Sequence, residues 1–95
     1  MKAKLLQEKA RVLNPLTVKI KEIESAIERL ESEFNTNIEL LIKASTESDG
    51  PAITTLSKKN SVLLPEIKEL YDHLEEVTSI YEKESLVFQN KLKNL

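Results

Sequence analysis

The chain has 95 residues, of which 32% are charged, and its formal net charge is −2. It contains one glycine and no cysteine, which excludes a disulfide framework, a thiolate metal site and the glycine-rich phosphate loops of nucleotide-binding enzymes. The start lacks the apolar stretch of a signal peptide, and no apolar run approaches the ~20 residues that span a membrane, so we expect a cytoplasmic protein without a membrane partner. Few aromatic residues among many Leu, Ile, Glu and Lys are typical of long amphipathic helices.

The first expected elements are a short N-terminal helical segment and a long helix. Residues 2–13 keep an apolar phase through Leu6, and Asn14-Pro15 resembles the start of a new helix. Alternating steps of three and four predict the a/d seam of a coiled coil over a helix at about 15–47. The seam residues are Leu13, Leu16, Ile20, Ile23, Ile27, Leu30, Phe34 and Leu41.

The only cluster of turn formers, at 45–51, predicts a turn at about 48–50. Either Asp49 or Gly50 can cap the following helix, with Pro51 at its first position. A second seam with the same spacing predicts a helix over about 51–94, and we expect Pro65 on its outer face to cause a kink and not a domain boundary. The second seam comprises Ile53, Leu56, Leu63, Ile67, Leu70, Leu74, Val77, Tyr81 and Phe88.

The two seams fit each other in a single antiparallel register. If Leu41 faces Leu56, the same register pairs Phe34 with Leu63, Leu30 with Ile67, Ile27 with Leu70, Ile23 with Leu74, Ile20 with Val77, and Leu16 with Tyr81. It also sets Asn37 opposite Asn60, the residues that interrupt the two seams. We therefore predict an all-α fold, one antiparallel two-helix coiled-coil hairpin domain over 1–95. The asparagines are interpreted as a buried amide pair that fixes the register, the alternative being two tolerated polar residues in an exposed seam.

No catalytic or metal-binding constellation is visible. His73 is the only histidine, and a straight helix offers neither a positioned nucleophile nor an oxyanion site, so we expect it to be a solvated residue. Adjacent carboxylates such as Glu75 and Glu76 do not converge on a metal. We expect no enzymatic activity and no cofactor in this chain.

Basic residues gather at the two ends of the chain. Residues 1–21 and 83–95 together carry nine basic and two acidic residues, a net charge of +7, whereas residues 22–82 carry a net charge of −9. An antiparallel hairpin joins both ends into one basic cluster that suits nucleic-acid phosphates, the alternative being that terminal lysines only keep the protein soluble. The candidate phosphate contacts, which would position by charge and not read bases, are Lys2, Lys4, Lys9, Arg11, Lys19, Lys91 and Lys93.

Several segments resemble the C-terminal coiled-coil domain of ABC-F family ATP-binding cassette ATPases. They are RVLNPL at 11–16, KIKEIESAIERLE at 19–31, ITTLSKK at 53–59 and LYDHLEE at 70–76, together with the Asp-Gly-Pro tip at 49–51. The resemblance covers nearly the whole chain. It implies a helical-hairpin appendage, with the ATP-binding cassettes upstream, that helps the parent ATPase engage ribosomal RNA and tRNA or branched DNA.

A second class of function stays open at this point, namely a protein-interaction or scaffolding coiled coil. This class includes prefoldin-like and homodimerising hairpins. It predicts that three apolar residues expected to be exposed, Ile38, Ile42 and Leu92, bury against a partner. The sequence leaves both a monomer and a weak homodimer open.

Overall fold

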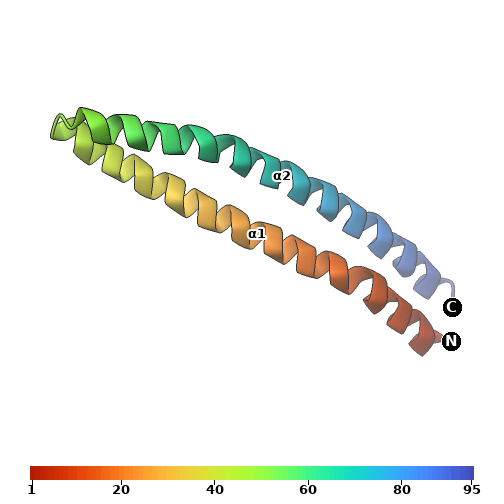
Figure 1. Cartoon of the computed structure of the whole chain (residues 1–95). Helices are drawn as coiled ribbons and strands as arrows, with labels where there is room; N and C mark the ends of the chain where they lie inside the picture. Colours follow the sequence, from red (N-terminus) through yellow and green to blue (C-terminus); the bar gives the residue numbers. More distant parts are fainter. The chain divides into compact units, whose positions relative to one another are not determined.

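The structure, a computed structural model that describes residues 1–95, contains two long helices joined by a tight turn (Figure 1). Helix α1 spans Lys2–Thr46 and helix α2 spans Gly50–Lys93. The predicted all-α hairpin is therefore confirmed. The helices pack against each other in two units, the open-end unit (residues 1–24 and 72–95) and the tip unit (residues 25–71).

In the tip unit the least exposed side chains follow the predicted seams. The seam residues Ile27 and Leu63 are buried, and so is Ala44, which continues the first seam three residues beyond Leu41. The remaining seam residues are half-buried, namely Leu30, Phe34, Leu41, Ile53, Leu56, Ile67 and Leu70. No large side chain anywhere in the chain is fully enclosed, because each helix has only one neighbour to cover it. The hairpin therefore depends on a narrow stripe of apolar burial.

The two asparagines form the predicted amide pair. The Nδ2 group of Asn37 donates to Oδ1 of Asn60 at 2.9 Å, and Asn60 Nδ2 donates to the backbone oxygen of Phe34 at 3.4 Å. Asn37 is 7% exposed and Asn60 is 8% exposed, and neither retains a buried polar atom without a partner. The alternative of two exposed, tolerated polar residues is wrong. The pair confirms the antiparallel register within the tip unit.

Each helix passes through a proline without interruption, and the expected separate N-terminal segment is instead the first part of α1. Proline lacks an N–H, so Pro15 removes the helix bond to the carbonyl of Arg11. Leu13 is nevertheless buried and Leu16 is half-buried, and Thr17 Oγ1 donates to the oxygen of Leu13 at 3.2 Å. Seam packing on both sides of Pro15 outweighs the lost hydrogen bond, so Asn14-Pro15 does not begin a helix.

The turn between the helices is a compact capping structure. Ser48 has a left-handed backbone with φ of 55°, its N–H donates to the oxygen of Ser45, and the N–H of Asp49 donates to the oxygen of Ala44 at 2.8 Å. This bond pattern is the Schellman motif, which ends α1. The Asp49 carboxylate then accepts a hydrogen bond from the N–H of Ala52 at 3.2 Å, so Asp49 caps α2. The structure thus selects Asp49 over Gly50 as the cap and places Pro51 second in the helix.

In the open-end unit the seam departs from heptad spacing near the chain ends. The less exposed residues at the start of α1 are Leu5, Lys9, Leu13, Leu16 and Thr17, and the step from Lys9 back to Leu5 is four residues, where the heptad would place Leu6. Rows of every fourth residue slant across a helix, and packing along such rows differs from coiled-coil packing. As a result Leu5 is half-buried and Leu6 is exposed, contrary to the predicted phase, and Leu92 is half-buried within the unit instead of awaiting a partner.

Candidate nucleic-acid interface

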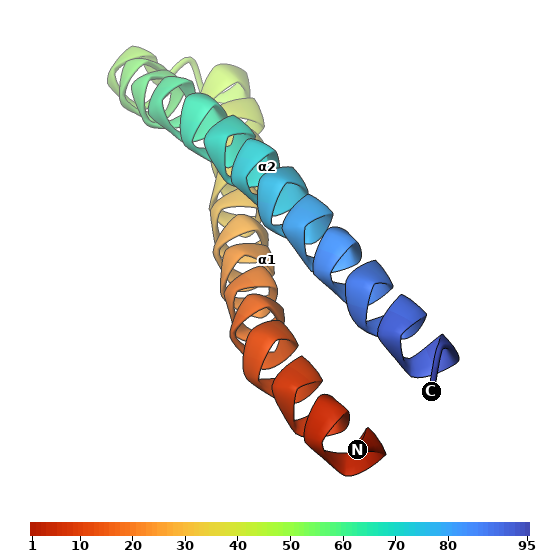
Figure 2. The same ribbon diagram turned by 90° about the vertical axis from the view of Figure 1, so that its right-hand side faces the viewer.

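The open-end unit brings the two ends of the chain together. Figures 1 and 2 show the N- and C-termini at the same end of this unit. A shallow hollow of about 480 Å³ lies between them. It is lined by Met1, Lys4, Leu5, Glu8, Lys91, Asn94 and Leu95. Lysines far apart in the sequence, Lys4 and Lys91, therefore share one surface, but Glu8 lines the same hollow and reduces its positive charge.

Six of the seven candidate phosphate contacts are exposed, and one is not. Lys2, Lys4, Arg11, Lys19, Lys91 and Lys93 are exposed. Lys9 is half-buried because it occupies a seam position, in the layer that the antiparallel register gives to Phe88. A lysine in such a place covers apolar surface with its methylene stem and turns only its ammonium group to water. Lys9 therefore serves packing first and has less freedom to meet a phosphate.

Three of the exposed cations form a row along α1. Lys4 and Arg11 lie seven residues apart, close to two helical turns, and Lys19 follows after eight residues, about 80° further around the helix. At 1.5 Å per residue, successive charges in this row lie about 10 and 12 Å apart along the helix axis. Helix α1 is continuous through Pro15, and this continuity keeps the three residues on one side of the helix. A break at Pro15 would have left the position of Lys19 independent of that of Lys4 and Arg11.

The cations of α2 lie at its C-terminal end. Lys91 and Lys93 fall in the last turn of the helix, where the partial negative charge of the unpaired carbonyls favours cations. The ammonium nitrogen of Lys91 lies 5.2 Å from the centroid of the Phe88 ring, within the range of a cation–π contact. Phe88 is only 5% exposed, so its ring is covered and presents no face on which a base could stack. The surface offers charge without an aromatic platform.

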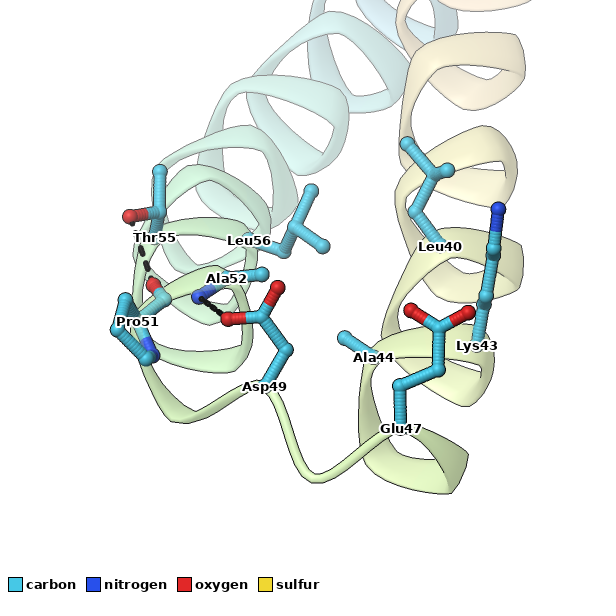
Figure 3. Close-up of a pocket in the computed structure, with 9 residues that line it drawn as sticks. All are labelled: Leu40, Lys43, Ala44, Glu47, Asp49, Pro51, Ala52, Thr55 and Leu56. Carbon is cyan, nitrogen blue, oxygen red and sulfur yellow. Dashed lines mark hydrogen bonds between the residues drawn. The ribbon is translucent and has the colours of Figure 1, made fainter.

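A second hollow lies in the tip unit. It measures about 560 Å³ and is lined by residues of both signs and by apolar side chains, namely Leu40, Lys43, Ala44, Glu47, Asp49, Pro51, Ala52, Thr55 and Leu56. Figure 3 shows the carboxylate of Asp49 turned toward the N–H of Ala52, where it caps the helix. The Asp49 carboxylate is thus occupied by its hydrogen bond to the backbone of α2. Across the chain no three His, Cys, Asp or Glu side chains come together in a way that could hold a metal ion.

One polar contact of the tip unit has no counterpart in the sequence analysis. The phenol of Tyr71 donates to Oε2 of Glu31 at 3.0 Å. This hydrogen bond, assisted by partial loss of hydration and by the negative charge of Glu31, raises the pKa of Tyr71 above its ordinary value. Both residues occupy e positions of their heptads, and e positions of antiparallel helices lie on the same flank, so heptad assignment could have found the pair.

Comparisons of the chain with models of protein families, with curated proteins and with solved structures found no match. Neither α1 nor α2 contains an apolar stretch that is long enough to cross a membrane. The case for a function therefore depends on the surface of the hairpin itself.

Proposed function

We propose that this chain is a non-catalytic helical-hairpin appendage that engages nucleic acid through the basic surface of its open-end unit. The observation that carries the proposal is the row of exposed cations Lys4, Arg11 and Lys19, together with Lys91 and Lys93 from the other end of the chain. Neutralising phosphates with lysine and arginine releases condensed counterions, and this gain is the main source of binding that does not depend on base sequence.

The contacts in this proposal position the nucleic acid and do not read it. Sequence readout needs side chains that reach base edges, and stacking on single strands needs exposed aromatic rings. The aromatic residues of the open-end unit are Phe88, which is buried, and Tyr81, which is half-buried. Discrimination among nucleic acids would accordingly come from their shape.

The parent protein is part of the same proposal. The resemblance to the C-terminal coiled-coil domain of ABC-F ATPases supports a role as an appendage of such an ATPase, acting on ribosomal RNA and tRNA or on branched DNA. The hairpin architecture and the convergence of both basic chain ends at one place agree with that role.

A titration of the full chain against fluorescent structured RNA, duplex DNA and branched DNA tests the proposal. The informative variant is Lys4→Ala/Arg11→Ala/Lys19→Ala, and the matched control is Lys43→Ala/Lys58→Ala/Lys59→Ala, which removes three exposed cations from the tip unit and changes the net charge equally. We expect the first variant to weaken binding by about tenfold or more at low salt and the control to change it by less than about twofold.

Two results contradict the proposal. Absence of binding to every probe at low salt would remove the nucleic-acid role and leave the hairpin as a protein-interaction element. Equal loss of affinity in the two triple variants would show that net charge alone, and not the open-end row, sets the binding.

A further inference from the structure

Over residues 33–47 and 52–66, one flank of the tip unit carries no charged side chain. We call it the neutral flank and define it by eight residues, Asn35, Ile38, Ile42 and Ser45 of α1 and Thr54, Ser57, Ser61 and Leu64 of α2. All eight are exposed. In a chain of which 32% is charged, an exposed surface of this size without a single charge is unusual.

The hydrogen bond between Tyr71 and Glu31 shows that the two helical rows form one surface. That bond joins e positions of α1 and α2 at 3.0 Å. One heptad closer to the turn, the same positions are occupied by Ile38 and Leu64, so these two side chains lie on the same flank. Ile42 follows Ile38 by one helical turn and extends the apolar area outward.

The opposite flank of the tip unit is different in kind. Over the same stretch of helix it carries charges of both signs, at Glu33, Lys43, Glu47, Lys59 and Glu66. The hollow drawn in Figure 3 belongs to that side. The absence of charge is thus a property of one flank and not of the tip unit as a whole.

We propose that the neutral flank is a self-association surface whose occupant is the same flank of a second copy of this chain. In a two-fold symmetric contact each residue near the axis meets its own kind or a close neighbour, so any charge there would face a like charge. A face without charges avoids that repulsion. Serine, threonine and asparagine side chains both donate and accept hydrogen bonds, so they can pair with identical groups, which lysine and glutamate cannot do.

The dimer would be a four-helix bundle with the apolar residues at its centre. Ile38, Ile42 and Leu64 would meet their counterparts from the second copy, ringed by hydroxyl and amide groups. The hydroxyls of Thr54 and Ser61 donate to backbone oxygens of their own helix at 3.1 and 2.7 Å, and their oxygens stay open to accept from the partner. Depletion of charge at the centre is also the general compositional signature of interface cores.

The apolar area of the neutral flank limits the affinity that the dimer can reach. Three half-exposed aliphatic side chains amount to an apolar patch on the order of 300 Å² per copy, which is at the lower edge of patches that are commonly functional. A stable interface buries about 1,200–2,000 Å² in total. We therefore expect a reversible dimer with a dissociation constant between about 100 μM and about 1 mM, and its formation does not depend on the proposed nucleic-acid role.

Sedimentation velocity and equilibrium measurements on the full chain, from about 10 μM to about 1 mM, test the proposal. The informative variant is Ile42→Lys, at a side chain that is 64% exposed on the neutral flank. The matched control is Val62→Lys, at a side chain that is 58% exposed but lies on the opposite flank. We expect the first to weaken dimerisation by at least about tenfold and the second by less than about twofold.

Two further measurements make the test specific. Leu64→Lys should weaken the dimer like Ile42→Lys, since the face spans both helices, and circular dichroism should show unchanged helix content in all three variants. Raising the salt concentration should leave the dimer intact, because no charges meet across the face, whereas it should weaken binding of nucleic acid.

A chain that stays monomeric to about 1 mM overturns the proposal, as does a dimer that Val62→Lys disrupts and Ile42→Lys spares. A dimer that added salt dissociates would also overturn it, because such a dimer would be held by charges elsewhere on the molecule.

Discussion

The amide layer formed by Asn37 and Asn60 leads to a quantitative expectation for stability. Replacing one asparagine by leucine gains about 1.5–3 kcal/mol from apolar burial but leaves a polar group of the other asparagine without its partner, at a cost of about 1–3 kcal/mol. In Asn37→Leu the unpaired group is Oδ1 of Asn60, and in Asn60→Leu it is Nδ2 of Asn37. Each single substitution should therefore change the free energy of unfolding by no more than about 2 kcal/mol in either direction.

The double substitution should behave differently from the sum of its parts. With leucine in both positions no buried amide is left without a partner. Both side chains then contribute their apolar burial, and the only loss is one hydrogen bond worth about 0.5–1.5 kcal/mol. The hairpin should gain roughly 2–4 kcal/mol, so the coupling energy of the double-mutant cycle should be at least about 1 kcal/mol in favour of the double variant.

Urea unfolding of the full chain, followed by circular dichroism, measures these free energies. The matched control is Asn14→Leu, the same substitution at an exposed position, which should change stability by no more than about 0.5 kcal/mol. Additive effects of the two singles would refute the reasoning, since they would mean that the amides are satisfied by water and not by each other. The double variant should also lose its unique register or oligomeric state, because a polar layer is what penalises slipped pairings.

Three other local features give further expectations. Ser48→Gly should stabilise the chain by about 0.5–1 kcal/mol in thermal unfolding, since Ser48 has a left-handed backbone that glycine adopts without steric cost, and a loss of stability would contradict the Schellman geometry. Pro65→Ala should stabilise by roughly 1–3 kcal/mol in urea unfolding by restoring a helix bond at an exposed position, and an unchanged midpoint would mean that the local helix is already broken. The raised pKa of Tyr71 means that its hydrogen bond to Glu31 contributes fully at pH values below the unfolded pKa near 10, and that this contribution is lost as the pH rises through the higher folded pKa. Ultraviolet titration should accordingly show Tyr71 ionising at higher pH in the wild type than in Glu31→Gln. Identical titration curves would show that Tyr71 does not donate this hydrogen bond to Glu31.

Much of the tip unit could be predicted from the sequence because its signal is periodic and long. Two seams with alternating steps of three and four allow only a few antiparallel registers, and the polar interruptions at Asn37 and Asn60 select one of them. The cap could be narrowed to Asp49 or Gly50, but the choice required the actual bond to the N–H of Ala52.

The chain ends were predicted less well because local signals compete there with packing. Asn14-Pro15 has the composition of a helix start. The helix nevertheless continues through it, because Leu13 before it and Leu16 after it both pack in the seam against α2. The change from heptad spacing to a step of four half-buries Leu5 in place of Leu6, and it depends on how the two helices cross, which no local pattern encodes. The cations of the candidate interface were named from charge alone, although Lys9 lies four residues before Leu13 in the heptad seam, so its partial burial could have been predicted.

The most direct test of the proposed function is the salt dependence of binding of the full chain to branched duplex DNA. If the open-end row of Lys4, Arg11 and Lys19 contacts phosphates, the logarithm of the binding constant should fall against the logarithm of salt concentration with a slope of about −3 or steeper. Replacing all three residues by alanine should reduce the magnitude of that slope by about 3, while the triple alanine control at Lys43, Lys58 and Lys59 should leave it unchanged. A slope near zero, or a slope that the open-end variant does not alter, would contradict a phosphate-binding role for this surface.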